Sequence, residues 1–413
     1  MQILFIHQGF PAQFRSYVQG MIAQGHEVHA IGADPDTVVP TGCHFHAYGT
    51  PVPLQPYQEI SDPGLENNLR RGERVADLAL TLKASSGLTP DVVVVHSGWG
   101  EGLYLREIWP ESVLIAYPEL YGSSDLLQVQ DPDSPPLDQA RRRLLKRNNL
   151  MALAALADAD AALTPTLFQR HSFPAPWRSR FQVIHEGVDC EALQPAPSRR
   201  IELKDGLSVG RSDPVLSFVS RSLEPMRGFG RLMRALPSLL NDHPNLQVVI
   251  VGGEGSSYSP PSPHPQGYLG ALLEELGDQL DRERLHLPGL LGREQLTALF
   301  QVSTVHAYLS HPYVLSWSLL EAMACGAVVV ASDTAPVRDV IRDGDNGLLV
   351  PLEDPGRITA GISAVLADPA GHQHLGVAAR ETVLRRFRRQ QAVDSFSQWI
   401  NSLVLLKTAR QRQ

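Results

Sequence analysis

The chain has 413 residues, of which 43% are hydrophobic and 19% are charged. At about 150 residues per domain, this length predicts two or three domains, and the apolar content excludes a disordered chain. The net charge of −8 argues against a dedicated nucleic-acid-binding protein, whose affinity comes mainly from neutralising phosphates.

The cysteines and the N-terminus indicate the compartment. Cys43, Cys190 and Cys325 are too few and too scattered for a disulfide framework or a zinc cluster, which favours a reducing compartment. Residues 1–7 lack a basic region followed by a long apolar run, so they predict a first strand and not a signal peptide. The apolar stretch 314–331 carries Glu321 near its middle, which is costly in a membrane helix. We therefore expect a cytoplasmic protein without a transmembrane segment.

The first half of the chain alternates strand and helix patterns. Residues 2–7 and 27–32 are rich in strand formers, and the segment between them has helical apolar spacing, which predicts a βαβ unit. Further short apolar runs lie at 91–96, 112–117, 160–165 and 182–185. Since these runs lack polar alternation, they suit parallel strands that are covered on both faces.

The second half repeats this organisation after a Pro-rich linker predicted at 193–200. Strands are predicted at 215–220, 247–251, 285–288, 305–309 and 328–332. The predicted fold class is α/β with two Rossmann-like, doubly wound parallel sheets that face a cleft, which is the default ligand site. We expect domains at 1–190 and 200–385, and a terminal helix at 390–413 that folds back on the first domain.

The turn after the first strand argues against dinucleotide chemistry. Residues 8–13 contain a single glycine, Gly9, where a dinucleotide-binding enzyme would have Gly-x-Gly-x-x-Gly, and no P-loop occurs. Gly9 either permits close approach of a ligand or serves only a tight turn. Asp-x-Asp pairs occur at several unrelated places, so the sequence predicts no metal site.

Two arginines follow the first strand of the second half. Arg221 and Arg227 lie between the apolar run 215–220 and a helical segment, where the carboxyl end of a strand is expected. Guanidinium groups in that place can hold a diphosphate through charge-assisted hydrogen bonds. Surface salt bridges are the alternative.

The segment 310–326 is the richest in chemistry. Glu321 lies in an apolar helical run, where a buried carboxylate needs hydrogen-bond donors such as a ribose diol. If a helix begins near Ser316–Ser318, its backbone N–H groups would point toward an anion.

With these segments the sequence resembles a family 4 (group 1) glycosyltransferase of the GT-B fold, a retaining, metal-independent class that uses nucleotide sugars. The resemblance covers essentially the whole chain and rests on residues 183–189, Arg221 with Arg227, 250–253, 319–326, 332–336 and 345–350. The Tyr-Val-Leu-Ser-Trp-Ser-Leu-Leu-Glu version of the family signature, residues 313–321, resembles that of a bacterial subgroup.

The resemblance implies a donor site in the second half. Arg221 and Arg227 would bind the donor diphosphate and stabilise its charge during catalysis, and Glu321 would hold the nucleotide ribose. Tyr313 stands where the family signature has its first Glu. The other predicted donor contacts are Gly9, Gly253, Glu254, Ser316, Trp317 and Ser318.

The acceptor is expected in the first half. His96, after the buried run 91–95, is predicted to position sugar and stabilise charge, with a strand-end cap as the alternative. Trp99 and Glu119 are predicted to contact the acceptor, although Glu119 could equally pair with a cation. The basic run Arg141 to Arg147 forms a solvated helix face or contacts an anionic membrane surface at the inner face of the membrane.

The predicted function is transfer of a sugar from a nucleotide-diphosphate sugar to a hydroxyl of a glycan, lipid or small-molecule acceptor, as in polysaccharide biosynthesis. No cofactor is expected besides this co-substrate. Two alternatives stay open: a non-catalytic nucleotide-sugar or glycan-binding protein, and another GT-B activity such as a nucleotide-sugar epimerase. An oxidoreductase is disfavoured by the missing glycine pattern.

Overall fold

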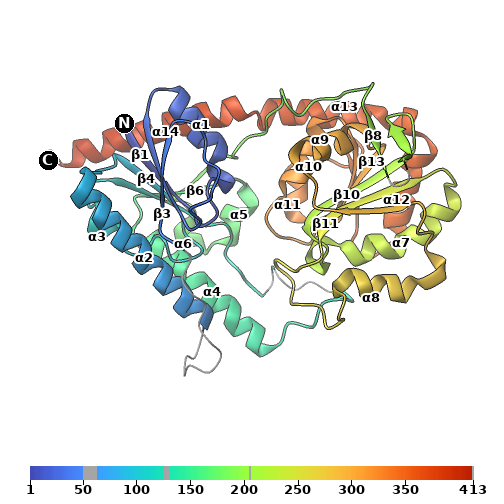
Figure 1. The fold of residues 1–413 in the computed structure, drawn as a ribbon, viewed down its shortest axis with the longest axis horizontal. Coiled ribbons are helices and arrows are strands. Elements are labelled where there is room, and N and C mark those ends of the chain that lie inside the picture. Colours follow the sequence, from blue (N-terminus) through green and yellow to red (C-terminus); the bar gives the residue numbers. More distant parts are fainter. Residues whose placement is uncertain (50–62, 125, 127–130, 204–205, 412–413) are drawn as a thin grey trace. The chain divides into compact units, whose positions relative to one another are not determined.

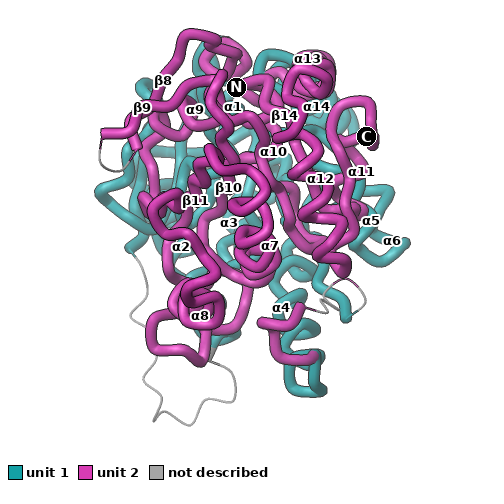
Figure 2. Tube along the Cα trace, turned by 90° about the vertical axis from the view of Figure 1, so that its right-hand side faces the viewer, with its two compact units in different colours: residues 1–125, 137–187, 389–413 teal, residues 126–136, 188–388 magenta. Residues whose placement is uncertain are grey.

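The computed structural model describes residues 1–49, 63–124, 126, 131–203 and 206–411. The chain forms two compact units (Figures 1 and 2). Unit 1 comprises Met1–Asp125, Leu137–Gly187 and Arg389–Gln413, and unit 2 comprises Leu126–Pro136 and Val188–Arg388. Unit 2 thus includes a short segment, residues 126–136, from within the first half of the chain.

Unit 1 is built on a seven-stranded parallel sheet in the order β3-β2-β1-β4-β5-β6-β7. Its central strands are fully buried runs of Val, Ile, Leu and Phe, as expected for a parallel sheet covered on both faces. The strands are β1 (Gln2–Ile6), β2 (Glu27–Gly32), β3 (Cys43–Ala47), β4 (Val92–His96), β5 (Val113–Tyr117), β6 (Ala161–Thr164) and β7 (Phe181–Val183).

Helices cover both faces of this sheet (Figure 1). On one face α1 (Arg15–Ala23), which follows the short helix η1 (Ala12–Phe14), packs together with α14 (Arg389–Gln411). The other face is covered by α2 (Pro63–Ser86), α3 (Leu105–Ile108), α4 (Gln139–Asp158), α5 (Leu167–Ser172) and α6 (Ala175–Arg178).

Unit 2 has a six-stranded parallel sheet in the order β12-β11-β10-β13-β14-β15. The strands are β10 (Val215–Ser222), β11 (Gln247–Gly253), β12 (Leu285–Gly289), β13 (Val305–Tyr308), β14 (Val328–Ser332) and β15 (Leu348–Val350). An antiparallel pair, β8 (Arg200–Glu202) and β9 (Ser208–Gly210), precedes the sheet. Residues 193–200, predicted as a linker, lie within unit 2, where Leu193 is buried among apolar side chains.

Two layers of helices enclose the second sheet. One layer contains α7 (Phe229–Asp242), α8 (Gly267–Leu276) and α12 (Pro355–Ala367), and the other contains α9 (Arg293–Val302), α10 (Trp317–Ala324), α11 (Ala335–Arg338) and α13 (Pro369–Arg386). The short helix η3 (Pro225–Arg227) lies between β10 and α7, and η4 (Gly277–Gln279) lies between α8 and β12. Each unit therefore has a parallel sheet between helical layers, and the predicted doubly wound α/β architecture is confirmed.

In the described part of the chain, no helix has both the length and the apolar composition needed to cross a membrane.

Candidate functional site

The strand order reverses once in each sheet, and several of the predicted residues follow the strands at these two places. In unit 1 the reversal lies between β1 and β4, and in unit 2 between β10 and β13. Open parallel sheets bind ligands outside the carboxyl ends of strands at such a switch point. The segments after β1 and β4 contain Gly9 and Trp99, while those after β10 and β13 contain Arg227 and Tyr313.

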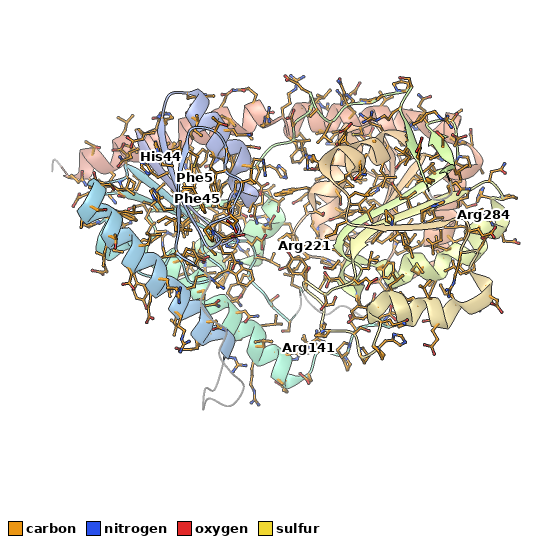
Figure 3. All side chains as sticks on the ribbon, viewed as in Figure 1. Phe5, His44, Phe45, Arg141, Arg221 and Arg284 are labelled. Atoms are coloured by element: carbon orange, nitrogen blue, oxygen red, sulfur yellow. The ribbon has the colours of Figure 1, made fainter. Side chains whose placement is uncertain are left out.

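The two predicted arginines lie in different environments. Arg221 is exposed near the end of β10 (Figure 3), and among the described residues it has neither an ion pair nor a hydrogen bond from its side chain. Arg227, on η3, is only 7% exposed, and its guanidinium carbon lies 5.0 Å from the centre of the Tyr258 ring. Its Nη1 atom is buried without a hydrogen-bond partner in the described part of the chain.

Glu224 has a role that the sequence did not indicate. This completely buried carboxylate accepts hydrogen bonds from the backbone N–H groups of Ser257, Tyr258 and Ser259 at 2.9, 3.0 and 2.9 Å. It therefore holds the loop that places Tyr258 over Arg227. Its only sequence signal was its position in the segment Leu223–Gly228, between the two arginines.

Gly228 explains how η3 approaches the neighbouring strand. Its φ of 71° lies in the left-handed region, and a Cβ there would collide with the carbonyl oxygen of Leu309. Only glycine combines this backbone with so close an approach. The loops after β10 and β13 are thereby held together within unit 2.

Helix α10 begins where the sequence predicted a helix start. Ser316 is its N-cap residue, and the Ser316 N–H donates to the Tyr308 hydroxyl at 2.9 Å. The Ser318 hydroxyl lies 3.4 Å from the carbonyl of Val219, while Trp317 is exposed. The amino end of α10 is thus fixed next to β10 and β13.

Tyr313 and Arg227 are brought together through one ring. The Tyr313 ring lies 4.5 Å from that of Tyr258, which in turn lies over Arg227. At the adjacent strand end, Leu223 N–H donates to the Gly253 carbonyl at 2.9 Å, and Glu254 is exposed. Gly253 therefore lies beside Arg221, whose carbonyl would be 3.4 Å from a Cβ on Gly253.

Glu321 is a buried carboxylate on α10, as predicted, but it has a protein partner. Arg293 on α9 donates to Glu321 Oε1 at 2.7 Å, and the Arg293 side chain is mostly exposed. The buried carboxylate of Glu321 is thus paired with the solvent-exposed guanidinium of Arg293. A ribose that binds Glu321 would thus have this arginine as its neighbour.

In unit 1, two histidines meet at the switch point. The rings of His7, after β1, and His96, at the end of β4, lie 4.6 Å apart. Burial lowers the pKa of His7 to about 4, with the hydrogen bond to Gln13 acting in the opposite direction. Burial, with His7 nearby, holds the pKa of His96 well below its usual range. His96 is therefore neutral at physiological pH, and its Nδ1 lacks a hydrogen-bond partner among the described residues.

The surroundings of Gly9 and Trp99 leave room for a ligand. Gly9 N–H donates to His7 Nδ1 at 2.9 Å, and a Cβ on Gly9 would come no closer than 3.8 Å to the His7 ring. Neither a collision nor a positive φ within the described residues requires glycine at this position. Trp99 is 40% exposed, and its ring lies 6.3 Å from His96 at an interplanar angle of 14°.

Glu119 and Glu101 are carboxylates of unit 1 that lie in different environments. Glu119, predicted to contact acceptor or a cation, accepts a hydrogen bond from Gln13 Nε2 at 2.9 Å. Glu101, for which no role was predicted, is 1% exposed, and burial raises its pKa to about 7. The Tyr48 hydroxyl lies 3.4 Å from its Oε1, and Oε2 has no partner in the described part of the chain.

The basic run, residues 141–147, lies in the amino-terminal half of α4, which is called its outer part below. Asp138 caps this helix by accepting the Arg141 N–H at 2.8 Å (Arg141, Figure 3). Arg143, Lys146 and Arg147 are exposed, and Leu144 is exposed among them.

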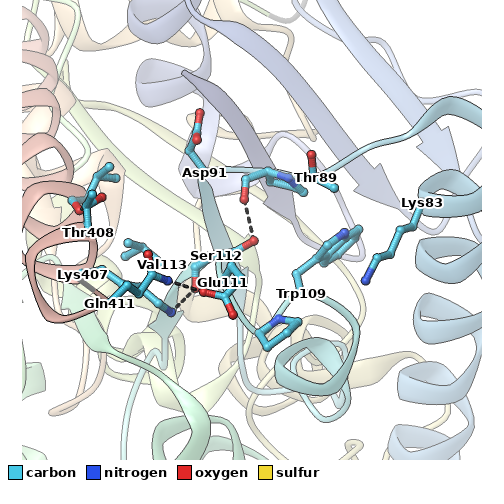
Figure 4. Close-up of a pocket in the computed structure, with 13 residues that line it drawn as sticks. Lys83, Thr89, Asp91, Trp109, Glu111, Ser112, Val113, Lys407, Thr408 and Gln411 are labelled. Atoms are coloured by element: carbon cyan, nitrogen blue, oxygen red, sulfur yellow. Dashed lines mark hydrogen bonds between the residues drawn. The ribbon is translucent and has the colours of Figure 1, made fainter. Parts of the chain in front are cut away.

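A cavity of about 340 Å³ lies in unit 1 at the opposite edge of the sheet (Figure 4). It lies near the amino ends of β4 and β5 and is lined in part by Trp109, Lys83 and Lys407. Lys83 donates to the Ile108 carbonyl and Lys407 to the Ser112 carbonyl, both at 2.6 Å. Because its cations are already engaged and it lies away from the switch point, we do not assign the site to it.

Both halves of the chain match known protein families. Residues 24–193 match the model described as Glycosyl transferase family 4 group, and residues 202–382 match that of Glycosyl transferases group 1. A D-inositol 3-phosphate glycosyltransferase from Acidothermus cellulolyticus is 31% identical over 194 residues, which cover 46% of this chain and 41% of that protein. The matched region thus spans less than half of this curated relative.

Solved structures share the fold over nearly the whole chain. Sucrose-phosphate synthase from Thermosynechococcus elongatus superposes with a TM-score of 0.76 at 20% identity, covering 98% of this chain and 100% of that one. Anabaena HepE in complex with UDP-glucose superposes with a TM-score of 0.68 at 16% identity, covering 97% and 100%. These likenesses confirm the predicted GT-B fold class.

Proposed function

The chain belongs to the group 1 glycosyltransferases, and on this premise we propose that it moves a sugar from a nucleotide-diphosphate sugar to an acceptor hydroxyl. The acceptor is a glycan, a lipid or a small molecule. We propose further that the transfer retains the configuration at the anomeric carbon and uses no metal ion.

The observation that carries the proposal is the buried guanidinium of Arg227, which has no ion pair among the described residues. A buried charge is costly unless it is paired, and the buried Arg231 follows this rule by pairing with Asp131 at 3.3 Å. Arg227 is equally buried, yet its Nη1 has no partner in the described part of the chain. An anionic ligand at the carboxyl end of β10 would supply the missing charge, and a diphosphate fits guanidinium geometry.

In this reaction the bond between the anomeric carbon and the donor phosphate oxygen breaks while the acceptor oxygen bonds to that carbon. The acceptor proton passes to the departing phosphate oxygen, so no protein base is required. Arg227 and Arg221 would stabilise the charge that develops on the diphosphate, an effect worth several kcal/mol in a preorganised site. Gly253, Glu254 and the residues from Tyr313 to Ser318 would surround the donor.

The unit 1 residues would serve the sugar and the acceptor. His96 is neutral, so its imidazole can donate a hydrogen bond to one hydroxyl group and accept one from another. Without a positive charge it does not attract anions. Trp99 offers an exposed aromatic face on which a sugar ring can stack. Gly9 leaves open space beside His7, and Glu119 could orient an acceptor hydroxyl.

The test replaces Arg227 with alanine and measures nucleotide binding and product formation with UDP-, GDP- and ADP-sugars. Loss of one charge-assisted contact of about 1.5–3 kcal/mol predicts binding that is at least roughly tenfold weaker. Arg342→Ala, which removes an exposed arginine of the same unit, is the control and should bind as the wild type does. Wild-type affinity and turnover in Arg227→Ala would contradict the diphosphate assignment.

A second candidate is a binding protein that does not turn over its donor, or an epimerase. Tyr313 supports it, because its ring packs against Tyr258 where the family signature has a carboxylate. A binding protein would take up nucleotide sugar without releasing nucleotide, whereas an epimerase would release nucleoside diphosphate without any acceptor. Acceptor-dependent nucleotide release would favour transfer over both.

We also propose that the outer part of α4 contacts an anionic membrane surface. Arg143, Lys146 and Arg147 are exposed in the same run of α4 as the exposed Leu144. Basic groups attract anionic headgroups, and an apolar side chain among them can enter the interface.

A further inference from the structure

A carboxylate from the first half of the chain is buried in unit 2. Asp131 belongs to the segment 126–136, which lies between β5 and α4 in the sequence but is part of unit 2. Its side chain is 1% exposed. The Asp131 Oδ2 atom lies 3.1 Å from His311 Nε2 and 3.3 Å from Arg231 Nε.

The partners of Asp131 keep it charged. Burial by itself would raise the pKa of this carboxyl, but the hydrogen bonds from His311 and the Asp133 N–H, together with the charge of Arg231, hold it below its usual range. His311 and Arg231 are themselves buried. Removing one partner of such a buried ion pair strongly destabilises a protein, because the other charge is then left unpaired.

His311 connects this ion pair to both loops of the candidate donor site. Its backbone N–H donates to the carbonyl of Met226 at 3.0 Å, next to Arg227. Met226 N–H in turn donates to Ser259 Oγ at 3.1 Å, in the loop that carries Tyr258. Tyr313 follows His311 by two residues and packs on that same Tyr258 ring.

We propose that Asp131 is a positioning residue for nucleotide-sugar binding. Through His311 it fixes the loop 310–316 against η3 and thereby sets where Tyr313 and Arg227 meet the ligand. This inference rests on the proposed function, because it takes a nucleoside diphosphate as the ligand of these two loops. It assigns part of the donor site to a segment from the first half of the chain.

The same segment provides a matched control in Asp133. This carboxylate forms two hydrogen bonds with Arg234, at 2.9 and 2.7 Å, on α7. Arg234 also binds Glu275 on α8 at 2.6 Å. Asp133→Asn therefore weakens the attachment of the segment without removing the carboxylate that binds His311.

The experiment compares Asp131→Asn and Asp133→Asn in the full chain, with UDP, GDP and ADP as probes for calorimetry. Kinetics with the matching nucleotide sugar give KM for donor and acceptor separately, and thermal unfolding of each variant reports the structural cost. We expect Asp131→Asn to weaken nucleotide binding and raise the donor KM at least roughly tenfold, since a displacement of about 1 Å can cost about a hundredfold. The acceptor KM should not change, and Asp133→Asn should bind nucleotide as the wild type does.

Equal losses in the two variants would overturn the proposal, because the segment would then act only through stability. Wild-type nucleotide affinity in Asp131→Asn would also overturn it, whatever the fate of the transfer reaction. Nucleotide binding without product in the wild type would contradict the proposed transfer and leave the role of Asp131 standing. Absence of nucleotide binding in the wild type would contradict both.

Discussion

Glu101 occupies an environment in which a carboxyl group changes its chemistry. Its side chain is almost completely buried at the switch point of unit 1, near Tyr48. Burial moves its pKa from an ordinary value of 4.5 to about 7. Near neutral pH the protonated form can donate a hydrogen bond and the ionised form can only accept one.

The first prediction follows from this shift. Between about pH 4.5 and about pH 7 the unfolded chain has already lost the Glu101 proton while the folded chain keeps it, so stability falls as pH rises through this window. Glu101→Gln removes this titration. Within the window, the free energy of unfolding of the variant minus that of the wild type should therefore increase by about 1.4 kcal/mol per pH unit. Urea unfolding at several pH values measures the difference.

The exposed Glu107 on α3 provides the control. Glu107→Gln should follow the wild-type pH dependence throughout. A constant offset between Glu101→Gln and the wild type from pH 5 to pH 8 would contradict the raised pKa of Glu101.

At the scale of elements, the buried strands could be predicted from the sequence, whereas some short or half-buried strands were missed. The buried apolar runs identified β1, β4 and β5 because a parallel sheet covered on both faces leaves little polar alternation. The strand β3 was missed, since its sequence Cys-His-Phe-His-Ala is only partly buried at the sheet edge. The short strand β15 likewise offers few residues to read.

The candidate site follows the same division. Arg227 and the start of α10 could be predicted because they follow strands whose carboxyl ends must meet at one edge of the sheet. Glu224, Glu101 and Asp131 were missed because their roles depend on burial and on partners distant in sequence. Spacing along the chain carries no information about such partners.

The second prediction concerns α4. If its outer face binds anionic lipid, replacing both Arg143 and Lys146 with Glu should reduce binding by about 1 kcal/mol or more for each charge. Co-sedimentation with vesicles of equal parts phosphatidylglycerol and phosphatidylcholine measures this loss. Glu at both Arg282 and Arg342, which lie in unit 2, is the charge-matched control. Equal sedimentation of the α4 variant and the control would contradict the membrane contact.

At the scale of the whole molecule, the last helix completes the unit that the first residues begin. Phe396 on α14 is fully buried, and its ring lies 4.4 Å from that of Tyr17 on α1. Where these two helices meet, a Cβ on Gly20 would collide with Val393, so the contact requires glycine. The hydrophobic cluster formed there also contains Phe5 and Ile3 of β1.

The final prediction is that Phe396→Ala destabilises unit 1 selectively. Removing a buried Phe side chain costs about 3–5 kcal/mol. This loss should lower the midpoint temperature at which unit 1 unfolds in calorimetry. The transition stabilised by bound nucleotide, assigned to unit 2, should keep its midpoint and its ligand shift. Leu405→Ala, at an exposed position of the same helix, should change neither transition. A loss of nucleotide affinity in Phe396→Ala would contradict this prediction. It would show that unit 2 depends on α14, although the two units have separate hydrophobic clusters.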